Sequence, residues 1–145
     1  MSRYLLDVNA LLALLDPMHV HHEAAHDWYG QRSRRLLLTC SHVENGVIRV
    51  ASQPKYPNCL GTSGRVREAL QRFIGHVSAE RCGREVALVD DSILLRLELL
   101  TPSRVSDLYL LALAAANESR LATFDRRIPA AAVAGGPKAL ELIPV

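Results

Sequence analysis

Short apolar runs alternate with stretches of helical periodicity along nearly the whole chain, and this alternation constrains the fold more than any other feature. The first run, Arg3–Asp7, precedes a periodic stretch over Asn9–Leu15, and the second run, Leu36–Cys40, precedes another over Ser41–Ser52. Short apolar runs are typical of buried strands, and i, i+3, i+4 spacing is typical of helices. Strands that alternate with helices pair in parallel, so the sequence predicts an α/β fold with helices on both faces of one sheet.

The remaining segments predict a three-layer α/β/α sandwich around a mostly parallel, roughly five-stranded sheet. Three more strands are expected at Glu85–Val89, Arg120–Asp125 and Ala139–Pro144. Further helices are expected at His22–Gln31, Arg65–His76, Ser92–Leu100 and Ser106–Asn117. The segment Gln53–Gly64, which is rich in proline and glycine, predicts a surface loop. With 49% hydrophobic residues the chain can bury a real core, and we expect residues 1–145 to form one domain.

Charge, hydropathy and cysteine usage exclude several classes of protein. The 17 basic residues nearly balance the 15 acidic ones, so a polyanion would be handled through a local site. The longest apolar runs, such as Leu110–Ala116, are far shorter than the ~20 residues of a membrane-spanning helix. Cys40, Cys59 and Cys82 are widely spaced and form no CxxC pair. We therefore expect a cytoplasmic protein without a disulfide framework or a cysteine-rich zinc site.

Four acidic residues from distant parts of the chain are expected to meet at one edge of the sheet. Asp7 and Asp125 end two predicted strands, Glu44 lies one turn into a helix, and Asp107 lies in a first helical turn. In parallel sheets, ligands bind beyond the carboxyl ends of the strands, where the strand order reverses. Carboxylates placed so close together repel one another, and a bound divalent cation offsets this repulsion. Oxygen ligands select Mg²⁺ or Mn²⁺, metals that promote phosphodiester hydrolysis, so the acids point to a nuclease.

Four sequence motifs, taken in order, resemble those of the PIN-domain ribonucleases, especially the VapC-type toxins of bacterial toxin–antitoxin pairs. They are YLLDVNALL from Tyr4, Glu44 in the helix after the second strand, SDLYLLALA from Ser106 and LATFD from Leu121. The resemblance runs nearly from end to end. It implies that Asp7, Glu44, Asp107 and Asp125 are the catalytic, metal-binding acids, supported by Asn9 and Thr123.

The same resemblance implies what the protein acts on and assembles with. It implies an RNA substrate, a cognate antitoxin that blocks the site, and a homodimer or a toxin–antitoxin hetero-oligomer. Arg126 and Arg127 directly follow Asp125, and we expect at least one of them to contact RNA phosphates. The arginines at positions 32, 34 and 35 indicate a solvated basic loop.

Each acid also has a structural interpretation, and two other functions remain open. Ser41 and Glu44 fit a capping box, the strand-end aspartates fit turns, and Asp90–Asp91 fits a cap for the helix expected near Ser92. An aspartyl-phosphate phosphatase is one alternative, although such enzymes usually have a second acid where Asn9 stands. A non-catalytic PIN-like module that binds RNA or protein is the other.

Four histidines crowd together near the N-terminus: His19, His21, His22 and His26. Two of them, His22 and His26, share a helical face at i, i+4, a spacing that can bind a transition metal. No suitably placed cysteine or third helical ligand completes a closed site. We interpret the cluster as the polar start of a helix.

Overall fold

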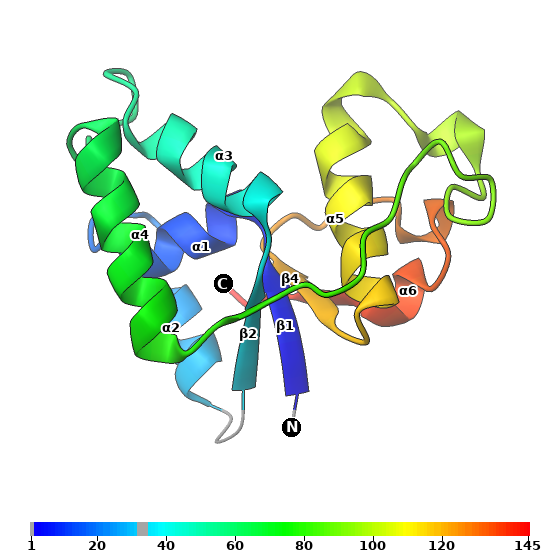
Figure 1. The fold of residues 1–145 in the computed structure, drawn as a ribbon, viewed down its shortest axis with the longest axis horizontal. Helices are drawn as coiled ribbons and strands as arrows, with labels where there is room; N and C mark the ends of the chain where they lie inside the picture. The colour runs from blue at the N-terminus through cyan, green and yellow to red at the C-terminus, as the bar shows by residue number, and fades with distance from the viewer. Residues whose placement is uncertain (1, 32–34) are drawn as a thin grey trace.

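A five-stranded, all-parallel sheet forms the centre of the computed structural model, which describes residues 2–31 and 35–145 (Figure 1). Its strand order is β3-β2-β1-β4-β5. The strands are β1 (Ser2–Leu6), β2 (Arg35–Thr39), β3 (Glu80–Arg81), β4 (Arg120–Thr123) and β5 (Leu140–Leu142). The predicted α/β class with a parallel sheet is confirmed.

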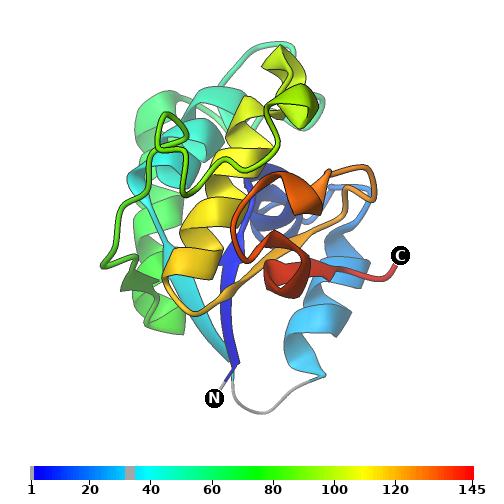
Figure 2. The same cartoon turned by 90° about the vertical axis from the view of Figure 1, so that its right-hand side faces the viewer.

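Helices cover both faces of this sheet, as the three-layer prediction requires (Figures 1 and 2). One layer contains α1 (Val8–Leu15), α2 (His22–Gly30), α3 (Ser41–Ala51) and α4 (Ser63–Val77). The opposite layer contains α5 (Val105–Ala116) and α6 (Gly136–Ala139). Among the described residues, none of the helices combines the length and the apolar character needed to cross a membrane.

The core lies where the central strands meet α1 and α5. Leu5 of β1 and Leu121 of β4 are fully buried, and Leu108 and Leu111 of α5 cover them. Parallel strands are buried on both faces, which explains their continuous apolar sequences. The guanidinium of Arg35 lies 3.9 Å from the centre of the Trp28 ring, so this arginine is not part of a solvated loop. Positions 32 and 34 of the same predicted loop lie outside the described residues.

The third strand differs from its prediction. It is the two-residue β3 at Glu80–Arg81, and Glu85–Val89 is irregular. The side-chain amide of Asn117 accepts a hydrogen bond from the Arg84 backbone N–H at 2.9 Å and donates one to the Arg84 carbonyl at 2.9 Å. These bonds tie the chain to the end of α5. Glu85–Val89 therefore leaves the sheet, although its apolar composition is typical of a strand.

The predicted helix at Ser92–Leu100 is also wrong. The segment contains turns and a short 3₁₀ helix at Leu97–Leu99. Its backbone bonds elsewhere: the N–H groups of Leu95 and Arg96 both donate to the carbonyl of Ala132. Asp90 does accept the Ser92 N–H, as a cap would, but a turn follows in place of a helix. Helical spacing of the leucines was therefore overridden by pairing with a distant segment.

The strand order reverses between β1 and β4, because β2 lies on one side of β1 and β4 on the other. A crevice forms outside the carboxyl ends of the strands at such a point, because the connections leave toward opposite faces. Asp7 directly follows β1, and Asp125 lies two residues after the end of β4. The fold thus places two of the four predicted acids at its topological switch point.

Candidate active site

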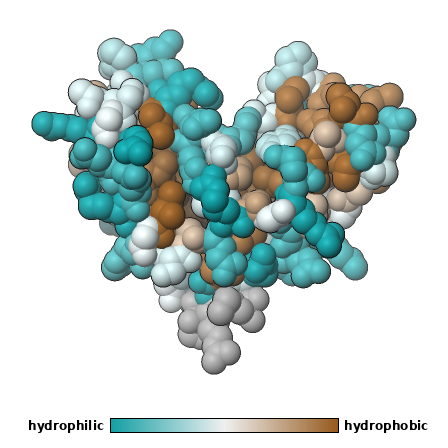
Figure 3. Space-filling view, viewed as in Figure 1, coloured by the Kyte–Doolittle hydropathy of each residue, from teal (hydrophilic) through white to brown (hydrophobic). Residues whose placement is uncertain are grey.

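A pocket of about 400 Å³ opens at this switch point, between α3 on one side and α5 on the other. Figure 3 shows the molecule hollowed between the two lobes to which these helices belong. Five of the predicted site residues line the pocket: Asp7, Asn9, Asp107, Thr123 and Asp125. Further polar lining comes from His42, Arg49 and Ser106. Three carboxylates from three separate parts of the chain therefore share one pocket, as the topology predicted.

Asp7 sits deepest and is held rigidly. Its Oδ1 accepts the Ala10 N–H at 2.8 Å as the N-cap of α1, and its Oδ2 accepts the hydroxyl of Thr123. Burial raises the pKa of Asp7 above its ordinary value, and the charges of Asp107 and Asp125 raise it further against these two hydrogen bonds. Asp7 therefore has a structural role, but as the N-cap of α1 and not in the turn that its place at a strand end suggested. This role coexists with a negative charge that its surroundings do not fully compensate.

Thr123 connects two of the acids. Its side chain is fully buried, donates to Asp7 and accepts the backbone N–H of Asp125 at 3.0 Å. The position at the end of β4 fixes this geometry, because Asp125 follows two residues later. The supporting position inferred for Thr123 agrees with these contacts. Asn9 also lines the pocket, and its Oδ1 lies 2.9 Å from Nε2 of His19.

Asp107 and Asp125 share a cation that the sequence prediction missed. Nη1 of Arg104 lies 3.0 Å from Oδ2 of Asp107 and 2.8 Å from Oδ2 of Asp125. The backbone N–H of Arg127 also donates to Oδ1 of Asp125 at 2.8 Å. Although burial opposes it, the Arg127 and Arg104 hydrogen bonds hold the pKa of Asp125 below its usual value. Asp125 is therefore ionised in a setting where Asp7 resists ionisation.

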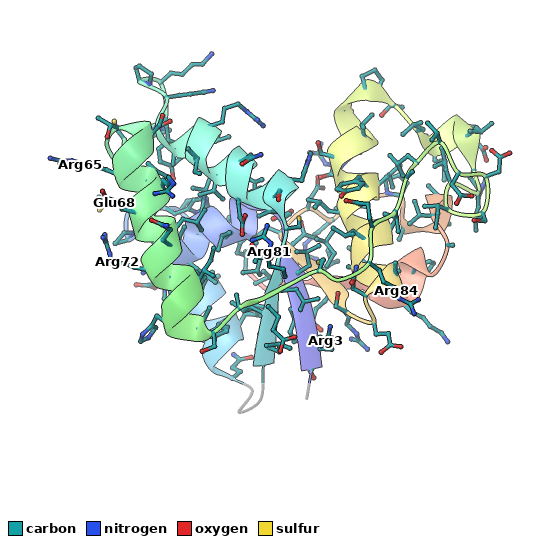
Figure 4. All side chains as sticks on the ribbon, viewed as in Figure 1. Arg3, Arg65, Glu68, Arg72, Arg81 and Arg84 are labelled. Atoms are coloured by element: carbon teal, nitrogen blue, oxygen red, sulfur yellow. The ribbon has the colours of Figure 1, made fainter. Side chains whose placement is uncertain are left out.

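Glu44 does not line the pocket. Its carboxylate accepts the Thr39 hydroxyl at 2.8 Å and pairs with both terminal nitrogens of Arg81, at 2.9 and 3.0 Å. Arg81 lies near the centre of the view in Figure 4, at β3 and below α3. The capping-box interpretation is wrong for Glu44, because these partners occupy its oxygens and the N-cap of α3 is Cys40. Glu44 faces the β3 side of α3, while the three aspartates face the pocket.

The wall opposite the acids carries positive charge from α3. His42, Gly46, Arg49 and Val50 line the pocket at helical spacing. The Nε2 atom of His42 lies 3.3 Å from Oγ of Ser106, which joins α3 to α5 across the pocket. Sequence reasoning did not place His42 here. The available signal was that these residues share a face of α3 that is offset by one position from the face of the buried Val43 and Val47.

The other predicted candidates lie outside the pocket lining. Arg126 and Arg127 are exposed beside Asp125, with Nε of Arg127 3.6 Å from its Oδ1. In the histidine cluster, ring nitrogens of His22 and His26 lie 2.7 and 3.0 Å from the last carbonyls of α1. These two histidines therefore cap α1, which gives them a structural role.

The donor set of the pocket fits a hard divalent cation. It offers aspartate oxygens, and burial together with the charges of Asp107 and Asp125 raises the pKa of Asp7, so a bound cation would favour its ionised form. In the part of the chain that the structure describes, no three His, Cys, Asp or Glu side chains already stand close enough to hold a metal ion. The chemistry of the three aspartates suits Mg²⁺ or Mn²⁺, and their side chains have to draw together around it.

Comparisons with known proteins agree with this geometry. A family model described as the PIN domain matches residues 4–134. The chain is 40% identical over 136 residues to Ribonuclease VapC44 of Mycobacterium tuberculosis, covering 94% of this chain and 95% of that protein. It is 37% identical over 124 residues to Ribonuclease VapC38 of the same species, covering 83% and 84% of the two chains. Ribonuclease VapC39 is 34% identical over 131 residues, covering 90% and 94%. The chain therefore belongs to the PIN-domain family, among the ribonucleases of the VapC type.

Proposed function

We propose that this protein is a divalent-metal-dependent endoribonuclease, the toxin of a toxin–antitoxin pair. The observation that carries the proposal is the meeting of Asp7, Asp107 and Asp125 in one pocket at the switch point of the sheet. The similarity to ribonucleases over nearly the whole chain supports the same reaction. The substrate is RNA, and the cofactor is Mg²⁺ or Mn²⁺.

The three aspartates would hold the metal, which when bound supplies an activated water and stabilises charge on the attacked phosphate. Thr123 keeps Asp7 oriented through its hydroxyl, so this carboxylate does not turn away from the pocket. Glu44 would join the metal-binding set only if its ion pair with Arg81 opened. We therefore place it outside the inner set of ligands and treat it as a carboxylate that Arg81 restrains.

The substrate's negative charge has to be accommodated beside an acidic site. Arg49 and His42 on the α3 wall face the aspartates and are placed to contact RNA phosphates entering the pocket. Arg126 and Arg127 extend positive charge along the opposite rim. Because these groups contact phosphate and do not read bases, RNA shape rather than base stacking would select the substrate.

The implied partner is an antitoxin that covers this pocket, and the working assembly is a homodimer or a toxin–antitoxin hetero-oligomer in the cytoplasm. The similarity to VapC proteins supports this part of the proposal. An acidic pocket flanked by exposed arginines would accept a partner that presents both basic and acidic side chains.

Cleavage of total RNA by protein freed of any partner tests the proposal. We expect cuts at a few sites in Mg²⁺ or Mn²⁺, none in EDTA, and no cutting of a single-stranded DNA control. Asp107→Asn should lower cleavage by more than about 100-fold, because a required cation ligand loses its charge. The matched control is Asp91→Asn at an exposed position away from the pocket, which should cut like wild type.

Two results would overturn the proposal. Equal cleavage by Asp107→Asn and wild type would remove the aspartates from the chemistry. A folded, metal-loaded protein that cuts no RNA would favour a binding module. If that protein instead acquired a phosphoryl group on Asp7, the phosphatase alternative would hold.

A further inference from the structure

One arginine occupies the position between two of the candidate metal ligands. Nη1 of Arg104 is a single nitrogen that lies 3.0 Å from Oδ2 of Asp107 and 2.8 Å from Oδ2 of Asp125. The Arg104 side chain is only 18% exposed, and those of its two partners are 25% and 29% exposed. Arg104 precedes α5 and lies three residues before Asp107, so its side chain reaches the acids from the same helix start.

This nitrogen lies between two carboxylate oxygens that a divalent cation would also use. A Mg²⁺ ion sits about 2.1 Å from its oxygen ligands and needs lone pairs of the kind now directed at Nη1. A guanidinium and a divalent cation at the same carboxylate oxygen repel each other at short range, so the two compete for Oδ2 of Asp107 and of Asp125. Within residues 2–31 and 35–145, no three potential ligands are already gathered to hold a metal. Asp107 and Asp125 are arranged around the guanidinium instead.

Nothing on the local backbone traps Arg104 in this place. The neighbouring residues Pro102, Ser103 and Val105 are all exposed, so the side chain has an open path to solvent. Its side chain bonds to the two aspartates, and the helix it precedes keeps its own buried face through Leu108 and Leu111. Release of the guanidinium therefore requires a side-chain rotation rather than unfolding of α5.

We propose that Arg104 is an internal competitor of the metal, a guanidinium that holds Asp107 and Asp125 together in the resting protein and must leave before a divalent cation binds. This inference rests on the proposed metal-dependent function. It makes metal binding an exchange of one cation for another. The resting protein is thereby stabilised without metal, and its apparent metal affinity is lowered by the fraction of molecules in which Arg104 is in place.

Manganese binding by Arg104→Gln, measured by calorimetry and by thermal unfolding, tests the exchange. Without metal, the variant should unfold at a lower temperature than wild type, because two carboxylates lose their partner. In Mn²⁺, the variant should bind about tenfold more tightly and gain more thermal stability than wild type gains. Arg104→Lys keeps a charge but not the fork-shaped guanidinium. Its Mn²⁺ affinity and its metal-free unfolding temperature should therefore lie between those of wild type and Arg104→Gln.

The matched control is Arg96→Gln, which breaks an exposed ion pair of 2.8 Å with Glu98 outside the pocket. It should leave the Mn²⁺ affinity and the Mn²⁺-induced stabilisation unchanged. An equal or weaker Mn²⁺ affinity in Arg104→Gln would overturn the inference, because it would mean that Arg104 and the metal bind together. If wild type still cleaves RNA and binds Mn²⁺ while that result is obtained, the exchange is wrong and the proposed function stands. If wild type neither cleaves RNA nor binds Mn²⁺, the proposed function itself is wrong.

A measurement on the wild-type protein keeps the inference falsifiable if Arg104→Gln does not fold. Side-chain NMR of the arginines, titrated with diamagnetic Mg²⁺, should show the Arg104 Nε–H signal moving to the position of a solvent-exposed arginine. The Arg96 signal should stay fixed in the same titration. An Arg104 signal that is unchanged when Mg²⁺ saturates the protein would contradict the exchange.

Discussion

Replacing Asp7 by Asn should make the metal-free protein more stable while abolishing metal binding. Asn keeps the shape of the side chain, and its oxygen can still accept the Ala10 N–H that begins α1, a capping role in which Asn and Asp are about equal. The new amide can donate to the Thr123 hydroxyl, which then accepts this bond beside that from the Asp125 N–H, while its own O–H loses the acceptor that Asp7 provided. The substitution therefore removes charge and keeps the contacts to α1 and β4, at the cost of one hydroxyl donor that offsets part of the gain.

The magnitude follows from the charges around Asp7. Its carboxylate is buried and is repelled by Asp107 and Asp125, each on the order of 1 kcal/mol in a partly screened site. Arg104 offsets part of that repulsion, because it pairs with both neighbours. We expect Asp7→Asn to gain about 1–2 kcal/mol in the free energy of unfolding at neutral pH, a rise in Tm of roughly 3–6 °C. Asp7→Ala loses the cap, worth about 1–2 kcal/mol, so its free energy of unfolding should not be higher than that of wild type.

The sign of the pH dependence follows from the raised pKa of Asp7. A carboxyl whose pKa is higher in the folded state favours folding most below its ordinary value of 3.8, and that contribution is lost as the pH rises through the raised pKa. The stability difference between Asp7→Asn and wild type should therefore be small near pH 4 and should widen toward pH 7. Asn does not titrate, so its own curve lacks this loss.

Urea unfolding in EDTA at several pH values, followed by the same series in Mn²⁺, measures these effects. Mn²⁺ should stabilise wild type and leave Asp7→Asn nearly unchanged, so the metal should reduce or reverse the gap between them. The reasoning is refuted if Asp7→Asn in EDTA at pH 7 is destabilised as much as Asp7→Ala. That result would mean that the ionised carboxylate stabilises the fold and that the pocket does not lack positive charge.

Two further predictions concern the packing of α1. Asp16 is fully buried and accepts the hydroxyl of Tyr56 at 2.6 Å and the amide of Asn58 at 2.7 Å, so Asp16→Ala should cost about 2–3 kcal/mol in urea unfolding by leaving these half-buried donors unpaired. The pKa of Asp16 is lowered, because hydrogen bonds outweigh burial, so its contribution should be present above its ordinary value and lost as the pH falls through the lowered one. In Gly46→Ala, the new Cβ would lie 2.6 Å from Cγ2 of Val8, and we expect a loss of about 1–2 kcal/mol and weaker RNA cleavage as α3 shifts. The control Gly75→Ala meets no atom within 4 Å and should gain up to about 1 kcal/mol in the same denaturation assay.

The positions of the aspartates could be predicted because topology alone determines them. A parallel sheet brings the carboxyl ends of its strands to one edge, so residues within two positions of the ends of β1 and β4 had to meet there. The position of Asp107 was predicted in the same way, because α5 directly precedes β4 in the chain and therefore begins at that edge of the sheet. The resemblance added Thr123, whose hydroxyl joins two of the acids. No contact between side chains was needed for these inferences.

The features of the fold and the site that the sequence did not predict depend on contacts between residues that are far apart in sequence. Glu44 turns to Arg81, which enters its surroundings only through the pairing of β2 with β3. The segment after β3 is irregular because Asn117 binds its backbone, and no local pattern announces that contact. Arg104 was closer to prediction, because it lies three residues from Asp107, where helical side chains meet. Its second bond, to Asp125, required the fold.

The most direct test of the central claim is the anomalous scattering of Mn²⁺ in crystals of the protein grown with that ion. The account predicts a Mn²⁺ peak bonded to carboxylate oxygens of Asp7, Asp107 and Asp125, with the Arg104 guanidinium outside its position between Asp107 and Asp125. A fully occupied peak elsewhere, with Arg104 still bonded to both aspartates, would contradict both the metal site and the exchange.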